Sequence, residues 1–159
     1  REAEAAVGAE GETPIGIMVE TPASAMMARE LAAEADFLSV GTNDLAQYAL
    51  AADRTNAAVS AMLDAFHPAV LRLVREASDG AAAHGRWLGV CGGLASDPLA
   101  APILVGLGVT ELSAAPMAVP AIKAAVRRLR LDECRRLAER ACAASSAHEV
   151  RAIAAEALA

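Results

Sequence analysis

Several residue types and patterns are scarce in this sequence of 159 residues, and each scarcity argues against a class of protein. Aromatic residues make up 3% of the chain, the net charge is -6, and no run is rich in Lys or Arg, so we expect no nucleic-acid partner. No apolar stretch approaches the roughly 20 residues of a membrane span, so we expect no membrane insertion. Three irregularly spaced Cys and no visible signal peptide favour a reducing, cytoplasmic compartment.

The apolar content is high instead, at 55%, and much of it is Ala, which suits helices packed closely on a sheet. The length favours one domain, which we place at residues 14–159 after a flank of residues 1–13 that is a helix end or a loop. Because the chain starts at Arg1 rather than Met, we expect a piece of a longer protein.

Short apolar runs alternate with longer segments of helical period, which predicts repeated βα units and an α/β fold with a parallel sheet. Strands are expected at 15–20, 37–40, 87–91 and 111–114, and helices at 22–35, 43–50, 68–84, 98–107, 119–129, 131–143 and 147–158. Four such strands are half of a (β/α)₈ TIM barrel, for which a complete chain needs about 250 residues. The pattern is therefore either a half-barrel with additional C-terminal helices or a small open α/β sheet.

Two carboxylates follow neighbouring predicted strands. Glu20 ends the first strand, and Asp44 lies just after the second. The carboxyl ends of parallel strands meet at one edge of a sheet, where α/β folds build ligand sites, and paired carboxylates suit Mg²⁺. Spacing alone leaves the alternative open that Glu20 is a surface residue and Asp44 a helix cap.

Three further side chains near this edge have functional groups that suit binding or catalysis. Asn43 can donate to a phosphate at a helix N-terminus, and Arg54 in the next loop can clamp one with two hydrogen bonds. Cys91, at the end of the third strand, can act as an acid, base or nucleophile. From spacing alone, a cap formed by Asn43 or Thr42, a surface Arg54 paired with Asp53 and a buried apolar Cys91 are the alternatives.

The remaining Cys and His residues carry no such pattern. Cys134 and Cys142 lie on one face of a predicted helix, where we expect buried apolar thiols. No two His have the spacing of metal ligands, so His67, His84 and His148 are expected to be structural or solvent-facing.

Several motifs occur in an order that resembles the C-terminal, phosphoenolpyruvate (PEP)-binding domain of enzyme I of the bacterial phosphotransferase system. The motifs are Gly16–Pro22, Ser39–Leu45 with Gln47–Tyr48, Ala52–Arg54 and Gly89–Gly92. The run Val90–Pro98 is further similar to the enzyme I module of fused multiphosphoryl transfer proteins. The resemblance covers nearly the whole chain from Pro14 onward, and it favours the half-barrel over the open sheet.

The resemblance implies a role for each candidate residue. Glu20 and Asp44 would bind Mg²⁺, Asn43 with the backbone at Asp44 would hold the phosphate, and Arg54 would clamp the phosphoryl group. Cys91 would protonate the methylene carbon of the enolpyruvate. The phosphoryl group would pass to a histidine of an absent N-terminal domain, then to a histidine phosphocarrier protein that serves sugar uptake. Family members dimerise through this domain, so a homodimer is expected.

The sequence departs from the family where Gly93 stands in place of the usual Glu two residues after the cysteine. The first four barrel strands, with their substrate-binding arginines, have no counterpart here, so we expect the isolated chain to be catalytically silent. Two alternatives remain: a fragment of a pyruvate phosphate dikinase or PEP synthase, and a non-catalytic half-barrel that assembles through its open strand edge.

Overall fold

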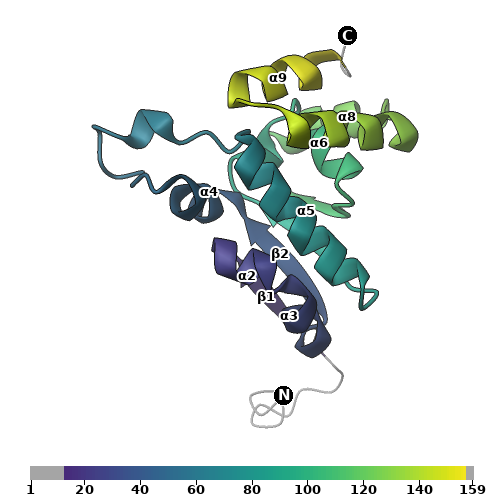
Figure 1. Ribbon diagram of the computed structural model, residues 1–159. Coiled ribbons are helices and arrows are strands. Elements are labelled where there is room, and N and C mark those ends of the chain that lie inside the picture. Colours follow the sequence, from purple (N-terminus) through teal and green to yellow (C-terminus); the bar gives the residue numbers. More distant parts are fainter. Residues whose placement is uncertain (1–12, 157–159) are drawn as a thin grey trace.

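A computed structural model describes residues 13–156 of the chain (Figure 1). The expected flank of residues 1–13, apart from Thr13, and the last two residues of the expected final helix lie outside the described residues. The strands are β1 (Gly16–Val19), β2 (Phe37–Gly41), β3 (Trp87–Cys91) and β4 (Glu111–Ser113). The α-helices are α2 (Pro22–Met26), α3 (Ala28–Glu34), α4 (Thr42–Leu50), α5 (Pro68–Ala82), α6 (Ala101–Gly106), α7 (Val119–Val126), α8 (Leu131–Ala143) and α9 (Ala147–Glu156).

The four strands form one parallel sheet in the order β1-β2-β3-β4, which is also their order in the sequence. The register pairs Val19 with Val40 and Val40 with Val90, and it places Gly41 beside Cys91. When each new strand is added on the same side of the previous one, right-handed crossovers place all the helices on one face, as in a barrel. In a doubly wound sheet the direction of strand addition reverses. The α/β fold and its four parallel strands are thus as expected for half of a TIM barrel.

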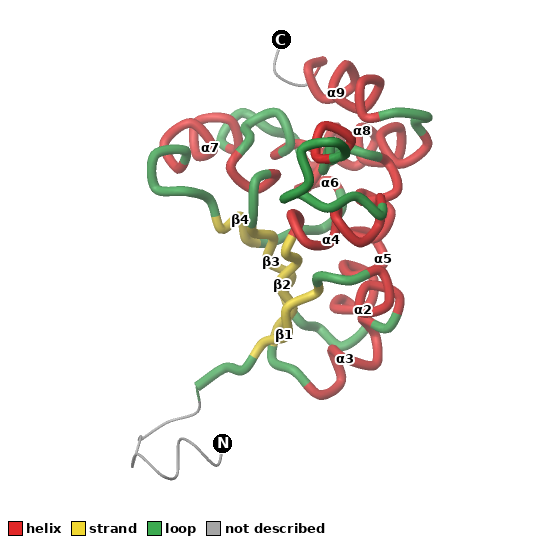
Figure 2. Tube along the Cα trace, turned by 90° about the vertical axis from the view of Figure 1, so that its left-hand side faces the viewer, coloured by secondary structure: helices red, strands yellow, loops and turns green. Residues whose placement is uncertain are grey.

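The two faces of the sheet differ in burial. Val19, Leu38, Val40, Leu88 and Val90 alternate along the strands and are at most 2% exposed, because the helices cover their face. Figure 2 shows the sheet with α2, α3 and α5 on one side of it. On the other face the alternate residues include Met18, 46% exposed, and Trp87, 39% exposed, whose ring stacks on Phe37 with centroids 4.2 Å apart. In a complete barrel this second face is the interior.

Local signals set most helix boundaries, although several differ from expectation; α7, for example, ends at Val126 rather than at residue 129. Thr21 caps α2 with a capping box that it shares with Ser24, as the Thr-Pro pair predicts. The helix expected over 22–35 is interrupted at Met27, where Gly80 of α5 packs against the backbone of Ala28 at the break. The helix expected from residue 98 begins only at Ala101, after a turn.

The C-terminal helices pack into the same core as the βα units. Leu137, Ala138 and Val150 of α8 and α9 belong to one buried cluster with the sheet residues Val40 and Val90. Gly106 at the end of α6 lets the backbone of α8 approach closely, because a Cβ there would overlap the carbonyl group of Cys134. None of the helices within residues 13–156 combines the length and the hydropathy that a membrane span requires.

Candidate functional site at the carboxyl edge of the sheet

The turn from β2 into α4 is built around the Glu20 side chain. Gly41 is the N-cap of α4, and no side chain caps this helix, so the expected cap by Asn43 or Thr42 is wrong. A Cβ on Gly41 would lie 2.5 Å from Oε1 and 2.8 Å from Cγ of Glu20. The missing side chain therefore makes the space in which the Glu20 carboxylate crosses from the end of β1 to the end of β2.

Thr42 ties this turn to the end of β3. Its side chain is fully buried, and its Oγ1 donates a hydrogen bond of 2.8 Å to the carbonyl oxygen of Cys91. Gly92 follows with φ +90, a conformation that favours glycine, and a Cβ there would lie 2.7 Å from Thr42 Oγ1. The turn after β2 and the loop after β3 are therefore in direct contact. Cys91, at the end of β3, is half-buried.

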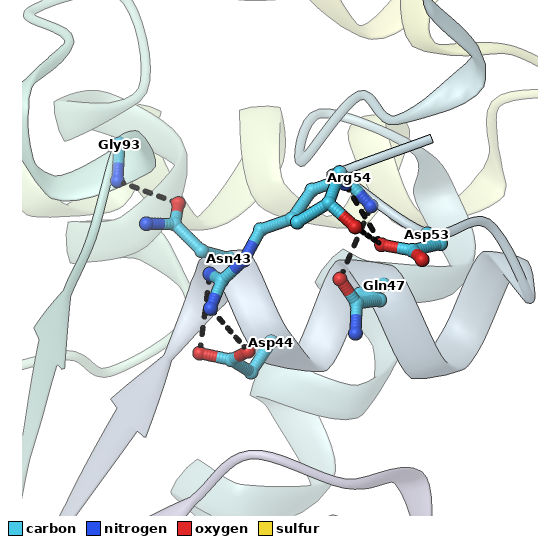
Figure 3. Close-up of polar contacts among 7 residues, drawn as sticks. Asn43, Asp44, Gln47, Asp53, Arg54 and Gly93 are labelled. Atoms are coloured by element: carbon cyan, nitrogen blue, oxygen red, sulfur yellow. Dashed lines mark hydrogen bonds and ion pairs between the residues drawn. The ribbon is translucent and has the colours of Figure 1, made fainter. Parts of the chain in front are cut away.

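Asn43 is oriented by the same loop, which explains why it is not a helix cap. Its Oδ1 accepts a hydrogen bond of 3.0 Å from the backbone N–H of Gly93 (Figure 3). With the oxygen engaged, the two N–H groups of the side-chain amide are the donors that remain for a ligand. Gly93 therefore takes part in this edge through its backbone N–H.

Arg54 returns across the start of α4 and pairs with Asp44. Its guanidinium makes two contacts with the carboxylate, of 3.1 Å and 3.4 Å, and its backbone N–H donates to Oε1 of Gln47 at 3.2 Å (Figure 3). Ala51, at the end of α4, turns the chain with φ 51, in the left-handed region. The loop that follows thereby brings Arg54 back to the N-terminal turn of the helix.

The alternative partner for Arg54, Asp53, is engaged elsewhere. The carboxylate of Asp53 accepts hydrogen bonds from the backbone N–H and the hydroxyl of Thr55, at 2.8 Å and 2.7 Å. These bonds, with a smaller contribution from the charge of Arg54, lower the pKa of Asp53. Of the two acidic side chains, Asp44 is therefore the one that pairs with Arg54.

A pocket of about 270 Å³ lies beside these side chains. Asn43, Ala46, Arg54, Ser60, Leu63 and Ala65 line it. Its polar groups come from an amide, a guanidinium and a hydroxyl, so the arrangement suits an anion with several oxygen atoms. Arg54 links this pocket to Asp44, and Asp44 follows the turn that holds Glu20.

The donor set at this edge fits a magnesium ion. Within residues 13–156, no three or more His, Cys, Asp or Glu side chains gather as a metal site. Glu20 and Asp44 are two carboxylates, and Mg²⁺ is commonly bound through one or two carboxylates while water and substrate phosphates complete its shell. The space at Gly41 that admits Glu20 is the feature of the fold that supports this fit.

Two further Cys residues and one His have structural surroundings. Cys134 and Cys142 are buried in α8, as expected, and burial raises the pKa of both thiols. His67 is the N-cap of α5 and accepts a hydrogen bond from the backbone N–H of Ala69.

The individual roles of Gly41, Thr42 and Gly92 were not predicted from the sequence. All three lie inside the motifs that carried the resemblance, which was the available signal, but the contacts they make depend on the register of β2 and β3.

Comparisons with known proteins agree on one family. A family model described as PEP-utilising enzyme, PEP-binding domain, matches residues 1–131. A multiphosphoryl transfer protein of Xanthomonas campestris pv. campestris is 54% identical over 145 residues, which are 91% of this chain and 17% of that protein. A phosphoenolpyruvate-protein phosphotransferase of Streptomyces coelicolor is 48% identical over 136 residues, which are 86% of this chain and 24% of that protein. The chain therefore spans about a sixth to a quarter of the length of these relatives.

Proposed function

The chain belongs to the PEP-utilising enzymes, as their PEP-binding domain, and we propose that it is the C-terminal part of a PEP–protein phosphotransferase. The family resemblance expected from the sequence motifs is confirmed by the match over residues 1–131. The names of the relatives favour a protein phosphotransferase over a pyruvate phosphate dikinase or a PEP synthase.

The observation that carries this proposal is the orientation of Asn43 beside Arg54. The Gly93 N–H holds the amide oxygen of Asn43, so the amide donors are free for the phosphate of PEP. Arg54 lines the same pocket and can bind phosphate oxygens through two N–H groups. We assign the phosphate to these two side chains and the metal to Glu20 and Asp44.

Each group has a task in the proposed reaction. Magnesium, when bound by Glu20 and Asp44, would neutralise charge on the phosphate, which is most of what phosphoryl transfer requires. Arg54 exchanges its contact with Asp44 for the phosphoryl oxygens. When the P–O bond to the enolpyruvate breaks, the Cys91 thiol gives its proton to the methylene carbon, and pyruvate forms. The Thr42 hydrogen bond to the Cys91 carbonyl oxygen keeps this thiol at the edge of the sheet.

The partners follow from the same proposal. The phosphoryl group goes to a histidine in a part of the protein beyond this chain, then to a histidine phosphocarrier protein for sugar transport. The proposal also includes a homodimer. It includes a cytoplasmic location because Cys91, Cys134 and Cys142 are free thiols, and a reducing compartment keeps thiols reduced.

Calorimetry of PEP binding in the presence and absence of Mg²⁺ tests this proposal. The parent chain is compared with Glu20→Ala and Asp44→Ala, and Glu34→Ala is the control because its exposed carboxylate lies on α3, away from the site. We expect magnesium-dependent binding that each of the first two variants loses and the control keeps. Binding that survives the loss of both carboxylates would overturn the metal assignment, and no binding to the parent chain would overturn the preformed half-site.

A further inference from the structure

Arg151, in α9, contacts two loops that are far from it in the sequence. Its guanidinium binds the carboxylate of Asp64 at 3.0 Å and 3.3 Å and lies 3.8 Å from an oxygen of Asp97. The same guanidinium stacks over the ring of Phe66, 4.0 Å from its centroid. We call Arg151, Asp64, Phe66 and Asp97 the α9 clamp. It connects the segment before α5 with the segment after β3.

The first arm of the clamp fixes one wall of the pocket beside Asn43. Leu63 and Ala65, the neighbours of Asp64 in the sequence, line that pocket together with Arg54. Phe66 is 3% exposed and belongs to the buried core, so its ring is a fixed surface under the guanidinium. The guanidinium is oriented by two contacts: it lies over an aromatic face, and two of its N–H groups bind one carboxylate. Both contacts fix its direction as well as its distance.

The second arm reaches the loop that orients Asn43. Asp97 is the C-cap of the short helix Leu94–Ser96, which begins directly after Gly93. The Gly93 N–H holds the Asn43 amide, and the carbonyl oxygen of Cys91, two residues earlier, holds Thr42. Asp97 is also tied to its own loop, because its Oδ1 accepts a hydrogen bond of 2.9 Å from the backbone N–H of Leu99.

We propose that Arg151 is a positioning residue, which sets the spacing between the loop of Arg54 and the loop of Cys91 and Gly93. This inference rests on the proposed function, because it takes Asn43 and Arg54 as the phosphate ligands. Arg151 lies 20 residues beyond the end of the family match at residue 131. The pocket beside Asn43 is thus shaped by a helix outside the segment that the family model matches.

Three variants of the full chain test the proposal. Arg151→Ala removes the clamp, and Arg151→Lys keeps the charge but not the forked geometry. Arg140→Ala is the matched control, because Arg140 of α8 holds Glu156 of α9 through two hydrogen bonds, of 2.7 Å and 2.9 Å, and so fastens the same helix. The first readout is amide hydrogen exchange, by mass spectrometry, in peptides that cover residues 60–67 and 92–99. The second is calorimetry of PEP with Mg²⁺.

We expect Arg151→Ala to raise exchange in both segments by about threefold to tenfold, since partly exposed ion pairs and cation–π contacts are each modest. Arg151→Lys should recover part of this protection, and Arg140→Ala should leave both segments as in the parent chain. PEP affinity should fall in Arg151→Ala and not in Arg140→Ala.

The outcomes separate this inference from the proposed function. Unchanged exchange in Arg151→Ala, or an equal rise in Arg140→Ala, would overturn the clamp. Raised exchange with unchanged PEP affinity would overturn its positioning role. If the parent chain binds no PEP, the proposed half-site fails, whereas the exchange data still decide whether Arg151 orders the two loops.

Discussion

A methyl group at Gly41 is expected to weaken metal binding without weakening the fold. The Cβ of Gly41→Ala would lie 2.5 Å from Oε1 of Glu20, and no other residue is among its three nearest atoms. The backbone of Gly41 has φ -86 and ψ 92, which alanine adopts without strain. The overlap is therefore relieved by moving the Glu20 side chain, which is flexible, rather than the sheet.

The size of this movement decides the effect. Ordinary van der Waals contact of a Cβ begins at 3.4 Å, so the carboxylate oxygen has to retreat by about 0.9 Å. Metal–ligand distances are held within about 0.2 Å, so the displaced carboxylate no longer fits the ion. We expect a loss of at least about tenfold in metal affinity, similar to that of Glu20→Gln. The free energy of unfolding should change by less than about 1 kcal/mol.

Binding of Mn²⁺, followed by electron paramagnetic resonance with Mg²⁺ as competitor, measures the affinity, and urea unfolding measures the stability. Gly85→Ala is the matched control with the opposite pattern. Gly85 has φ +64, which is strained for alanine, but no atom beyond its two chain neighbours lies within 4 Å of its Cβ position. The control should lose about 1–2 kcal/mol of stability and keep its metal affinity.

Two results would refute this reasoning. Full metal affinity in Gly41→Ala would mean that Glu20 is not held in the space at Gly41 or does not bind the ion. If the double variant Gly41→Ala/Glu20→Gln bound the metal much more weakly than either single variant, the two changes would act independently. The proposed route, in which the methyl group acts by displacing Glu20, would then be wrong.

Two further predictions concern stability. In Gly106→Ala, the added Cβ overlaps the backbone carbonyl of Cys134, which cannot move aside as a flexible side chain can, so we expect a loss of about 1–3 kcal/mol in urea unfolding; an unchanged midpoint would contradict the close packing of α6 on α8. Burial raises the pKa of the Cys142 thiol above its ordinary value of 9.0, so the unfolded chain releases this proton first. The contribution of this thiol to the free energy of unfolding is fully present below pH 9.0 and is lost as the pH rises through the folded-state pKa. Cys142→Ala should therefore show a smaller fall in urea midpoint than the parent chain between neutral pH and about pH 10, and equal falls would refute the assignment.

The fold was largely predictable because its signals are local. The apolar runs that predicted the strands lie within one or two residues of the observed strands, since a strand buried by helices needs a continuous apolar segment. The Thr21–Pro22 pair gave the start of α2. The break at Met27 was not predictable, because it lies where Gly80, more than fifty residues later, packs against Ala28.

The placement of the candidate residues at one edge was predictable from the sequence, but their contacts were not. Chain order alone placed Glu20, Asp44 and Cys91 at one edge, because parallel strands end together. The partners of Asn43 and Arg54 were beyond reach: Asn43 binds the backbone of Gly93, fifty residues later, and Arg54 binds Asp44 rather than its neighbour Asp53. Both contacts depend on how the loops fold back over the sheet, and the local periodicity of the sequence does not predict loop conformation.

The open sheet and the charges at its edge together explain why the isolated chain is expected to be catalytically silent. Met18 and Trp87 leave exposed the face that a barrel encloses, so the described strands form a wall rather than a closed cavity. Phosphoryl transfer depends on positive charge around the phosphate and on exclusion of water. At the described edge, Arg54 lines the pocket beside Asn43, and its charge is balanced by the carboxylate of Asp44. The proposed transfer therefore requires further positive charge and a second wall on this face of the sheet.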